Sequence, residues 1–418
     1  MHTFTHNSMS SLIHLQGVII YKINEDNEKF SVTISQPRAP SNCIHCNSKN
    51  FIKNGKGRIR KLRHGMVISG KMLFLLWKSR RFKCNNCKKT WTIKPPGYLV
   101  DGRKRSTRHC RNQALRTLKT NSFNNTSKQT GLSHGTLKEI LHTFMSTKPL
   151  LNIPNNGPLV LGVDEHGRAK RKLSTTITLI KPERRLLGLL PEATSIKLVE
   201  WVQKYMPEDQ RMRVEEISMD MTKSLKKQLR ILFPKAKFVM DHFHVIAYLN
   251  NIIRDEYLFK TRYGNLSKEQ KMNLPLRTTK SLSVTRLLYQ GGAHWKEKDN
   301  EKVKAVFTVM PRIAELWYAK EEVRAIYRES LDKNEARERW EYVLSLLPTV
   351  AKRTLRIHLE EILNYFDNKT TNAFTEGVHT KIKLLKRMSF GIKNPQVYVE
   401  KLELGFVEPQ KLIHNHTY

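Results

Sequence analysis

The chain has 418 residues, which is enough for roughly two or three domains. Its 75 lysines and arginines exceed its 37 aspartates and glutamates by 38. Self-repulsion of this size argues against an ordinary enzyme of small metabolites and implies a polyanionic partner. Because the basic residues lie along the whole chain, a nucleic acid is favoured over an anionic membrane surface. No apolar stretch is long enough to span a membrane, and the first residues lack a signal-peptide pattern, so we expect a cytoplasmic protein.

Four of the five cysteines form two CxxC knuckles near the N-terminus, Cys43 with Cys46 and Cys84 with Cys87. The stretch between the knuckles can hold a β-hairpin, as it does in zinc ribbons. Two such turns supply the four thiolates of a closed tetrahedral site, which a structural Zn²⁺ prefers. The alternative is two unrelated reduced pairs or redox dithiols. Cys110 has no partner in the sequence and is expected to be a core thiol of a helix.

Residues 108–145 are helical and basic, and they predict a helix-turn-helix. A first helix is followed by a short second one, a turn that contains Gly131, and a third helix that Ser133 opens as N-cap. In such motifs the last helix enters the major groove with its N-terminal residues toward the bases. Those residues would be His134, Thr136 and Lys138. A plain packing hairpin is the alternative, since helical hairpins with a glycine turn are common.

From residue 159 onward the pattern alternates between strands and helices. Apolar runs and period-two alternation predict strands at 159–164, 174–181, 184–191, 214–220 and 237–241, with helices at 195–206 and 224–233. Three antiparallel strands followed by α/β alternation is the order of the ribonuclease H fold. From about 255 to 355 the spacing is helical only and indicates an all-helical insertion. A last helix carries Val378, Ile382 and Leu385 on one stripe.

Three carboxylates in this region are candidates for phosphoryl-transfer chemistry. Asp164 ends the first strand, Asp220 ends the fourth, and Glu376 lies on the last helix, opposite its apolar stripe. Neighbouring strand ends can bring the two aspartates together, and a helix packed across that edge can add the glutamate. Three clustered carboxylates repel one another, so the arrangement predicts that Mg²⁺ or Mn²⁺ neutralises them. Taken singly, each residue could instead be a cap, a turn residue or part of a solvated helix face.

Five further segments stand out, namely SRRFKCNNC, GVDEHGRAKR, SMDM, FPKAKFVMDHFHVIAYLN and FDNKTTNAFTEGVHTKIKLLKRMSFGIKN, in this order along nearly the whole chain. Together they resemble the ISL3 family of bacterial insertion-sequence transposases. The resemblance implies that the acidic triad of the DDE type falls on Asp164, Asp220 and Glu376. It also matches Asp241 and His244 to the DxxH element of related transposases.

Some assignments within this resemblance stay open. Asp241 also ends a strand and is an alternative second metal ligand, although the strand order favours Asp220. His244 is either an orienting partner near the cleft or an ordinary helix-packing residue. Lys383 and Arg387 lie on the Glu376 side of the last helix, where they can hold DNA phosphates.

The resemblance implies a multidomain fold in which a zinc ribbon and a helix-turn-helix precede an α/β ribonuclease H-like core with an all-helical insertion. The expected domains are the zinc ribbon at 1–100, the helix-turn-helix at 101–150, the first part of the core at 157–254, the insertion at 255–355 and the last part of the core at 356–418. The implied activity is that of a DDE transposase. It acts on double-stranded DNA at the element ends and at the target, as a homodimer or higher oligomer associated with the nucleoid. The alternatives are a sequence-specific DNA-binding regulator with an inert core and a structure-selective nuclease without strand transfer.

Overall fold

The structure is a computed structural model, and the residues it describes are 17–36, 39–66, 70–169, 172–220, 223–264, 266–275 and 283–412. The chain divides into two compact units. One comprises residues up to 150 together with those from 381 onward, and the other comprises residues 151–380. Among the described residues, no helix combines the length and the apolar character that crossing a membrane requires.

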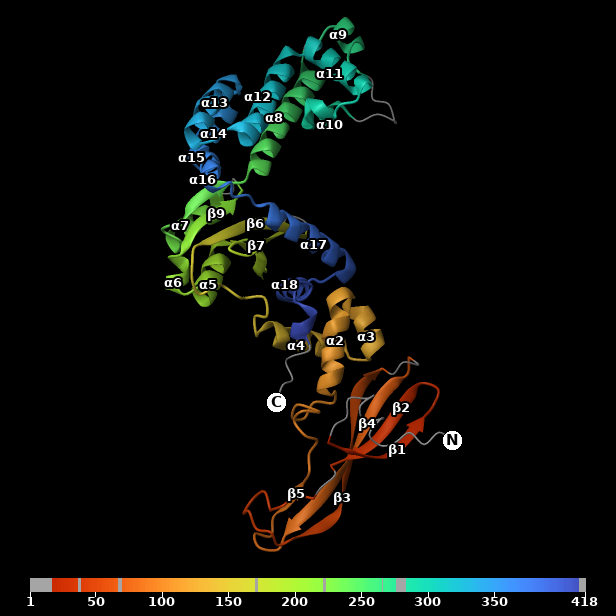
Figure 1. The fold of residues 1–418 in the computed structure, drawn as a ribbon. Helices are drawn as coiled ribbons and strands as arrows, with labels where there is room; N and C mark the ends of the chain where they lie inside the picture. The colour runs from red at the N-terminus through yellow and green to blue at the C-terminus, as the bar shows by residue number, and fades with distance from the viewer. Residues whose placement is uncertain are drawn as a thin grey trace. The chain divides into compact units, whose positions relative to one another are not determined.

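The first unit begins with a five-stranded sheet (Figure 1). Its strands are β1 (Ile19–Glu25), β2 (Lys29–Ser35), β3 (Phe51–Met66), β4 (Met72–Cys84) and β5 (Thr90–Thr92). The order is β1-β2-β4-β3, and β5 pairs with the far end of β4. Alternate residues of β4 are buried, among them Leu73, Leu75 and Trp77, because successive side chains of a strand point to opposite faces. β4 extends to Cys84, the first cysteine of the second knuckle.

The rest of the first unit is a small helical bundle. It contains α2 (Arg108–Thr120), α3 (Phe123–Thr130), α4 (His134–Met145) and α18 (Pro395–Leu404), with a short 3-10 helix, η2, at Pro409–Leu412. The side chain of Ser133 accepts a hydrogen bond from the amide of Thr136 and caps α4, as the sequence predicts. Gly131 ends α3 in the left-handed region with φ +63°, which favours glycine. Cys110 is fully buried in the bundle core, and this prediction is confirmed too.

The second unit contains a five-stranded mixed sheet. Its strands are β6 (Leu159–Ala169), β7 (Lys172–Lys181), β8 (Arg185–Leu190), β9 (Val214–Met219) and β10 (Lys237–Met240), and its helices on the way are α5 (Ser195–Tyr205), α6 (Glu208–Arg211) and α7 (Lys223–Leu232). The order across the sheet is β10-β9-β6-β7-β8. β6 pairs parallel with β9 and antiparallel with β7. All the predicted strands and helices of this region are present, and among its described residues the four-residue α6 is the one element that was not predicted.

The two faces of this sheet differ in character. Leu161, Val163 and Ile177 belong to an apolar core that also contains Trp201 of α5 and Leu229 of α7. Because side chains alternate along a strand, the intervening residues of β6 lie on the other face. There they face α17 (Ala373–Ser389), whose Thr375 hydroxyl lies against Gly162 of β6. The apolar face therefore stabilises the sheet and leaves the opposite face for polar groups.

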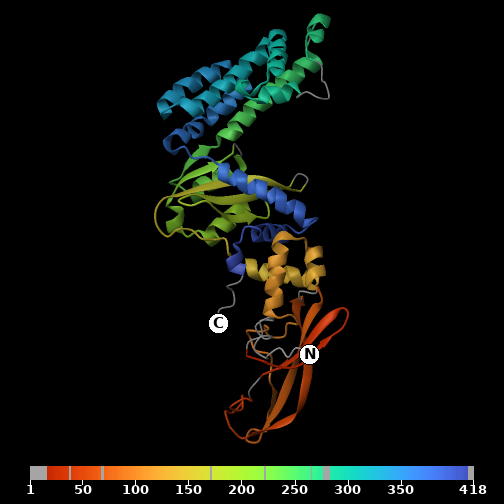
Figure 2. The same cartoon turned by 45° about the vertical axis from the view of Figure 1, so that its right-hand side comes forward.

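Between β10 and α17, the regular elements of the described residues are all helices, as the apolar spacing predicts (Figure 2). They are α8 (His242–Tyr263), α9 (Lys268–Met272), α10 (Val284–Tyr289), η1 (Gly292–His294), α11 (Glu297–Val309), α12 (Pro311–Glu329), α13 (Lys333–Leu346), α14 (Thr349–Ile357), α15 (Leu359–Leu363) and α16 (Tyr365–Asn368). They share one apolar core, centred on residues such as Val323 and Trp340. Residue 255, where the sequence places the start of the insertion, lies inside the continuous helix α8.

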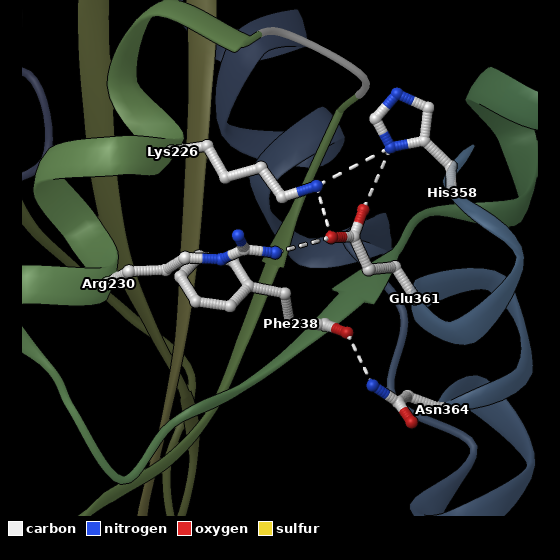
Figure 3. Close-up of polar contacts among 6 residues, drawn as sticks. All are labelled: Lys226, Arg230, Phe238, His358, Glu361 and Asn364. Atoms are coloured by element: carbon white, nitrogen blue, oxygen red, sulfur yellow. Dashed lines mark hydrogen bonds and ion pairs between the residues drawn. The ribbon is translucent and has the colours of Figure 1, made fainter. Parts of the chain in front are cut away.

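A polar cluster joins this helical part to the sheet, and Figure 3 shows it at the meeting of α7, β10 and α15. Glu361 forms ion pairs with Lys226 and with Arg230, whose Nη2 lies 3.2 Å from Oε1. His358 Nδ1 lies 2.9 Å from Glu361 Oε2. Burial alone would raise the pKa of Glu361, but the hydrogen bonds from His358 and Lys226 outweigh it and lower that pKa below its usual value. The carboxylate is therefore charged and partnered in the fold.

Replacing Glu361 by glutamine should reduce the free energy of unfolding by about 3 kcal/mol, because the largely buried Lys226 then keeps its charge without a counter-charge. The pKa of Glu361 is lower in the fold than the ordinary 4.5, so its contribution is complete above that pH and is lost as the pH falls through the lower folded value. Urea unfolding at pH 7 and at acidic pH measures both effects.

The matched control is Glu341→Gln. Glu341 pairs with Arg356 on the same helical part, but both side chains are about half exposed. Its loss should cost less than about 0.5 kcal/mol. Equal destabilisation by the two variants at pH 7 would show that the cluster of Figure 3 does not join the two parts more firmly than a surface pair does.

Candidate functional site

Three aspartates form a row at one edge of the second sheet. The pairing of β6 with β9 and that of β9 with β10 both end at Met219. The next residue on each of the three strands is an aspartate, namely Asp164, Asp220 or Asp241. Because the three strands are parallel and in register, these residues occupy neighbouring positions, and we call them the carboxylate row. The juxtaposition expected of Asp164 and Asp220 is present.

Electrostatic strain in the row is visible at Asp164, which is only 7% exposed. Burial is the largest cause that raises its pKa, and the charges of Asp220 and Asp241 act in the same direction, so that the pKa is about 6. The amide of Glu165, which donates to Oδ1 at 2.7 Å, and the nearby His244 act in the opposite direction without cancelling the shift. Burial and the charges of Asp220 and Asp164 also raise the pKa of Glu165. Ionising two carboxylates of this row at once therefore destabilises the fold unless a cation neutralises them.

A second grouping lies beside Asp164 and contains Asp241, His244 and Glu376. Their possible ligand atoms all lie within 4.8 Å of one another. Asp241 is fully buried; its Oδ1 accepts a hydrogen bond from the amide of Asn372 at 3.4 Å, while its Oδ2 has no hydrogen-bond partner among the described residues. An unpaired buried carboxylate oxygen is expensive, and a divalent cation is the natural partner for it. The donors present, oxygen atoms and one imidazole, fit such an ion.

Contacts on the polar face of the sheet fix the start of α17. The hydroxyl groups of Thr178 and Thr375 lie 2.7 Å apart over Gly162, where an added Cβ atom would collide with the Thr375 hydroxyl. Glycine at this position therefore allows the helix to approach the strand. On β9, the carboxylate of Glu216 accepts a hydrogen bond from Thr370, just before α17 begins. These contacts place Glu376 beside the carboxylate row.

The sequence interpretation did not identify two histidines that the structure places here. His379 Nδ1 lies 3.5 Å from Asp164 Oδ2, and its Nε2 lies 2.9 Å from the hydroxyl of Thr176. His166 Nδ1 lies 3.0 Å from the same hydroxyl. The spacing contains the signal for both: His379 follows Glu376 by three residues on one helix, and His166 follows Asp164 by two residues on one strand.

The four knuckle cysteines form a second candidate metal site, and their ligand atoms also lie within 4.8 Å of one another. The Sγ atoms of Cys43 and Cys87 are 3.8 Å apart, and those of Cys46 and Cys84 are 3.6 Å apart. A tetrahedral Zn²⁺ with Zn–S bonds of about 2.3 Å needs sulfur atoms roughly 3.8 Å apart. The arrangement therefore fits the structural zinc that the spacing predicts.

The two knuckles have matching backbones. In each one the residue after the second cysteine, Asn47 or Lys88, has φ +57°. Trp91 and Phe82 stack on each other and pack with Cys43 and Cys84, which are buried, whereas Cys46 is exposed. Burial opposes ionisation of Cys84, but hydrogen bonds from the amides of the second knuckle outweigh it and lower the pKa of Cys84 to about 6. A thiolate is the form that binds metal.

The predicted DNA-contacting residues occupy two helices. His134 and Lys138 at the start of α4 are exposed, and Thr136 between them is half-buried. Lys383 and Arg387 are exposed on α17. The predicted apolar stripe of α17, Val378, Ile382 and Leu385, is buried. All five candidate residues are therefore at least partly accessible to a ligand.

Two family models match the chain, and one of them supports the four-cysteine site. A family model for ISL3-type DDE transposases, described as "Transposase", matches residues 161–402, more than half of the chain. Another, described as the zinc-finger of transposase IS204/IS1001/IS1096/IS1165, matches residues 39–87. The chain is also similar to the transposase for insertion sequence element IS1001 of Bordetella parapertussis, with 22% identity over 256 residues. That similarity covers 59% of this chain and 60% of the relative's length.

Replacing Cys84 by serine should remove the zinc, one ion per chain, and unfold the zinc ribbon, because a thiolate-bound structural ion supplies folding free energy. Elemental analysis and limited proteolysis of the purified protein measure the two effects. His45→Gln is the control, since His45 lies inside the first knuckle but is not in the cysteine cluster. An absence of zinc from freshly purified wild-type protein would contradict the prediction, as would zinc loss from His45→Gln.

Proposed function

The chain belongs to the ISL3 family of transposases, and we propose that it is a DDE transposase acting on the terminal inverted repeats of its own insertion sequence. It hydrolyses the phosphodiester at the element ends and uses the freed 3′-hydroxyl to attack target DNA. The observation that carries this proposal is the carboxylate row with Glu376 and His244 beside it. Buried acidic groups gathered at a sheet edge destabilise a fold, so their presence calls for a function.

The proposed metal ligands are Asp164, Asp220 and Glu376, which would hold Mg²⁺ or Mn²⁺. Asp241 is the alternative to Asp220, and its place in the cluster with Glu376 and His244 supports it as a ligand or a close neighbour. When bound, the metal would supply the activation of a water or hydroxyl group and the stabilisation of the leaving oxygen in phosphoryl transfer.

The protein's own residues prepare the site. His379 lies between Asp164 and the hydroxyl of Thr176, and these contacts hold the Asp164 carboxylate in one orientation. The contact of Thr375 with Thr178 sets the depth of α17, and with it the position of Glu376. In each turnover a bond from the attacking oxygen to phosphorus forms as the bond from phosphorus to the 3′-oxygen breaks. Fixed carboxylates serve such a reaction because it needs position more than covalent chemistry.

The strand order and the helical insertion support the proposed fold. The order β10-β9-β6-β7-β8, with a three-strand antiparallel meander and two parallel additions, supports a ribonuclease H-like core. The helices between β10 and α17 would be its insertion, and α3 and α4 would be a helix-turn-helix. The proposed domains are the zinc ribbon at 1–100, the helix-turn-helix at 101–150, the first part of the core at 157–254, the helical insertion at 255–355 and the last part of the core at 356–418.

The proposed partner is double-stranded DNA, both at the element ends and at the target. The helix α4 would read base edges through His134, Thr136 and Lys138, while Lys383 and Arg387 would hold phosphates. The protein would act as a homodimer or higher oligomer on DNA in the bacterial nucleoid. A DNA-binding regulator with an inert core would use the same helices but would not need the strained carboxylate row. Metal-dependent cleavage of element ends distinguishes the two.

Changing Asp164 or Asp220 to asparagine, or Glu376 to glutamine, should abolish cleavage of an end-containing duplex in Mn²⁺. Binding to the same duplex should remain within about a factor of three, because the ligands and the DNA-docking residues are different. Asp209→Asn, an exposed change in the same unit, is the control and should cut normally. An Asp220→Asn protein that still cuts while Asp241→Asn does not would make Asp241 the second ligand.

Thr136→Ala and Lys138→Ala should reduce the preference for the terminal repeat over random DNA by about 1–3 kcal/mol for each base edge that the variant no longer reads. Lys383→Ala and Arg387→Ala should instead weaken binding to all sequences alike, because phosphate contacts carry no sequence information. Competition binding with both DNAs separates the two outcomes. Unchanged preference in the first pair and lost preference in the second would mean that α4 does not read the sequence.

A further inference from the structure

A basic cavity lies in the first unit, where the β-sheet meets the helical bundle. Its volume is about 820 Å³, and its walls come from β3 and β4, from the loop before α2, and from the turn between α3 and α4. Seven of its fifteen lining residues are lysine or arginine. Glu139 is the one acidic residue among the described residues that line it, so the lining carries a formal charge of about +6.

Two segments supply most of this charge. The strand β3 contributes Arg60, Lys61 and Arg63, and the loop at residues 103–105 contributes three more basic side chains. Lys61 and Arg63 both lie over the ring of Phe74, with the Lys61 Nζ at 4.0 Å from its centre. The ring therefore holds two like charges side by side within the cavity wall.

The backbone holds the loop firmly against β3. The amide of Arg63 donates to the carbonyl of Arg105 at 2.9 Å, and the amide of Thr107 donates to the carbonyl of Arg63 at 2.9 Å. The guanidinium of Arg60 donates to the carbonyl of Lys104. These hydrogen bonds hold the positive side chains of β3 and the loop close together, although the side chains repel one another. Such an arrangement suits a polyanionic ligand.

Glu139 compensates only part of this charge. Its Oε1 lies 3.2 Å from Arg111 Nη2 and 3.4 Å from Lys104 Nζ. The Glu139 side chain is 52% exposed, so both ion pairs are weak ones that an incoming phosphate can replace.

The cavity also touches the start of α4. The guanidinium of Arg63 lies against Gly131, where a Cβ atom would be only 2.5 Å from its Nη1. Ser133, the N-cap of α4, and Thr136 in its first turn line the same cavity. A strand of DNA backbone in the cavity would therefore border the groove that α4 enters.

We propose that this cavity is a phosphate-binding site for the backbone of duplex DNA, so that β3 and the 103–105 loop act together with α4 as one DNA-binding surface. This inference rests on the proposed function, in which α4 lies in the major groove. The inference adds a second DNA contact to that of α4, because the cavity beside the β-sheet would bind the DNA strand that borders the major groove.

The test compares Arg103→Gln/Arg105→Gln with the charge-matched control Lys22→Gln/Arg116→Gln, whose residues are exposed in the same unit outside the cavity. The probe is the full-length protein with a duplex of its own element end and with a random duplex. The cavity variant should bind both more weakly, and its plot of log affinity against log salt should flatten by about 0.9 for each phosphate that it no longer neutralises. Equal slopes for the cavity variant and the control would overturn the inference.

Two further measurements make the result specific. Glu139→Gln should bind both duplexes several-fold more tightly, a gain that misfolding cannot produce; unchanged or weaker binding would contradict the inference. Neutral methylphosphonates placed one at a time along the element end should identify phosphates whose loss weakens the wild type but not Arg103→Gln/Arg105→Gln. If no such phosphate exists, the cavity does not hold the backbone. If the wild type itself shows no preference for its element end, the proposed function fails instead.

Discussion

Repulsion among acidic groups at one sheet edge is the constraint around which the second unit is organised. At an effective dielectric of about 20, two unit charges about 4 Å apart repel by about 4 kcal/mol. The raised pKa of Asp164, about 6, reflects its burial and then these neighbours. The opposite, apolar face of the sheet, packed against α5 and α7, provides the stability that holds the row in place. The helix α17 then adds a further carboxylate, Glu376, instead of relieving the strain.

The sequence was most informative where local rules decide the structure. Apolar runs and alternation predicted the strands of the second sheet, and helical spacing predicted α5, α7 and the helices after β10. Capping residues located the turn between α3 and α4, because a glycine that ends one helix and a serine that begins the next stand two residues apart, at Gly131 and Ser133. The CxxC spacing predicted the four-cysteine site because each knuckle is a local structure. In all these cases the information lies within a few neighbouring residues.

Contacts between segments that are distant in the chain were harder to predict from the sequence. The sequence predicted that Asp164, Asp220 and Glu376 come together, but not that Asp241 and His244 group more tightly with Glu376. It did not find His379, whose role depends on the orientation of α17 over β6. Nor did it find the basic cavity, because β3, the 103–105 loop and the turn before α4 are separate in the chain. Strand register and the approach at Gly162 determine the contacts around the carboxylate row, and neither is encoded in local spacing.

The central claim is that the carboxylate row is kept for a divalent cation at the expense of stability. Thermal unfolding of the wild type and of Asp164→Asn, each with and without Mn²⁺, tests it most directly. Without metal the variant should melt several degrees higher, because one buried like charge is gone, and Mn²⁺ should stabilise the wild type but not the variant. A wild type that Mn²⁺ does not stabilise, together with an Asp164→Asn protein that melts lower than it, would contradict the account.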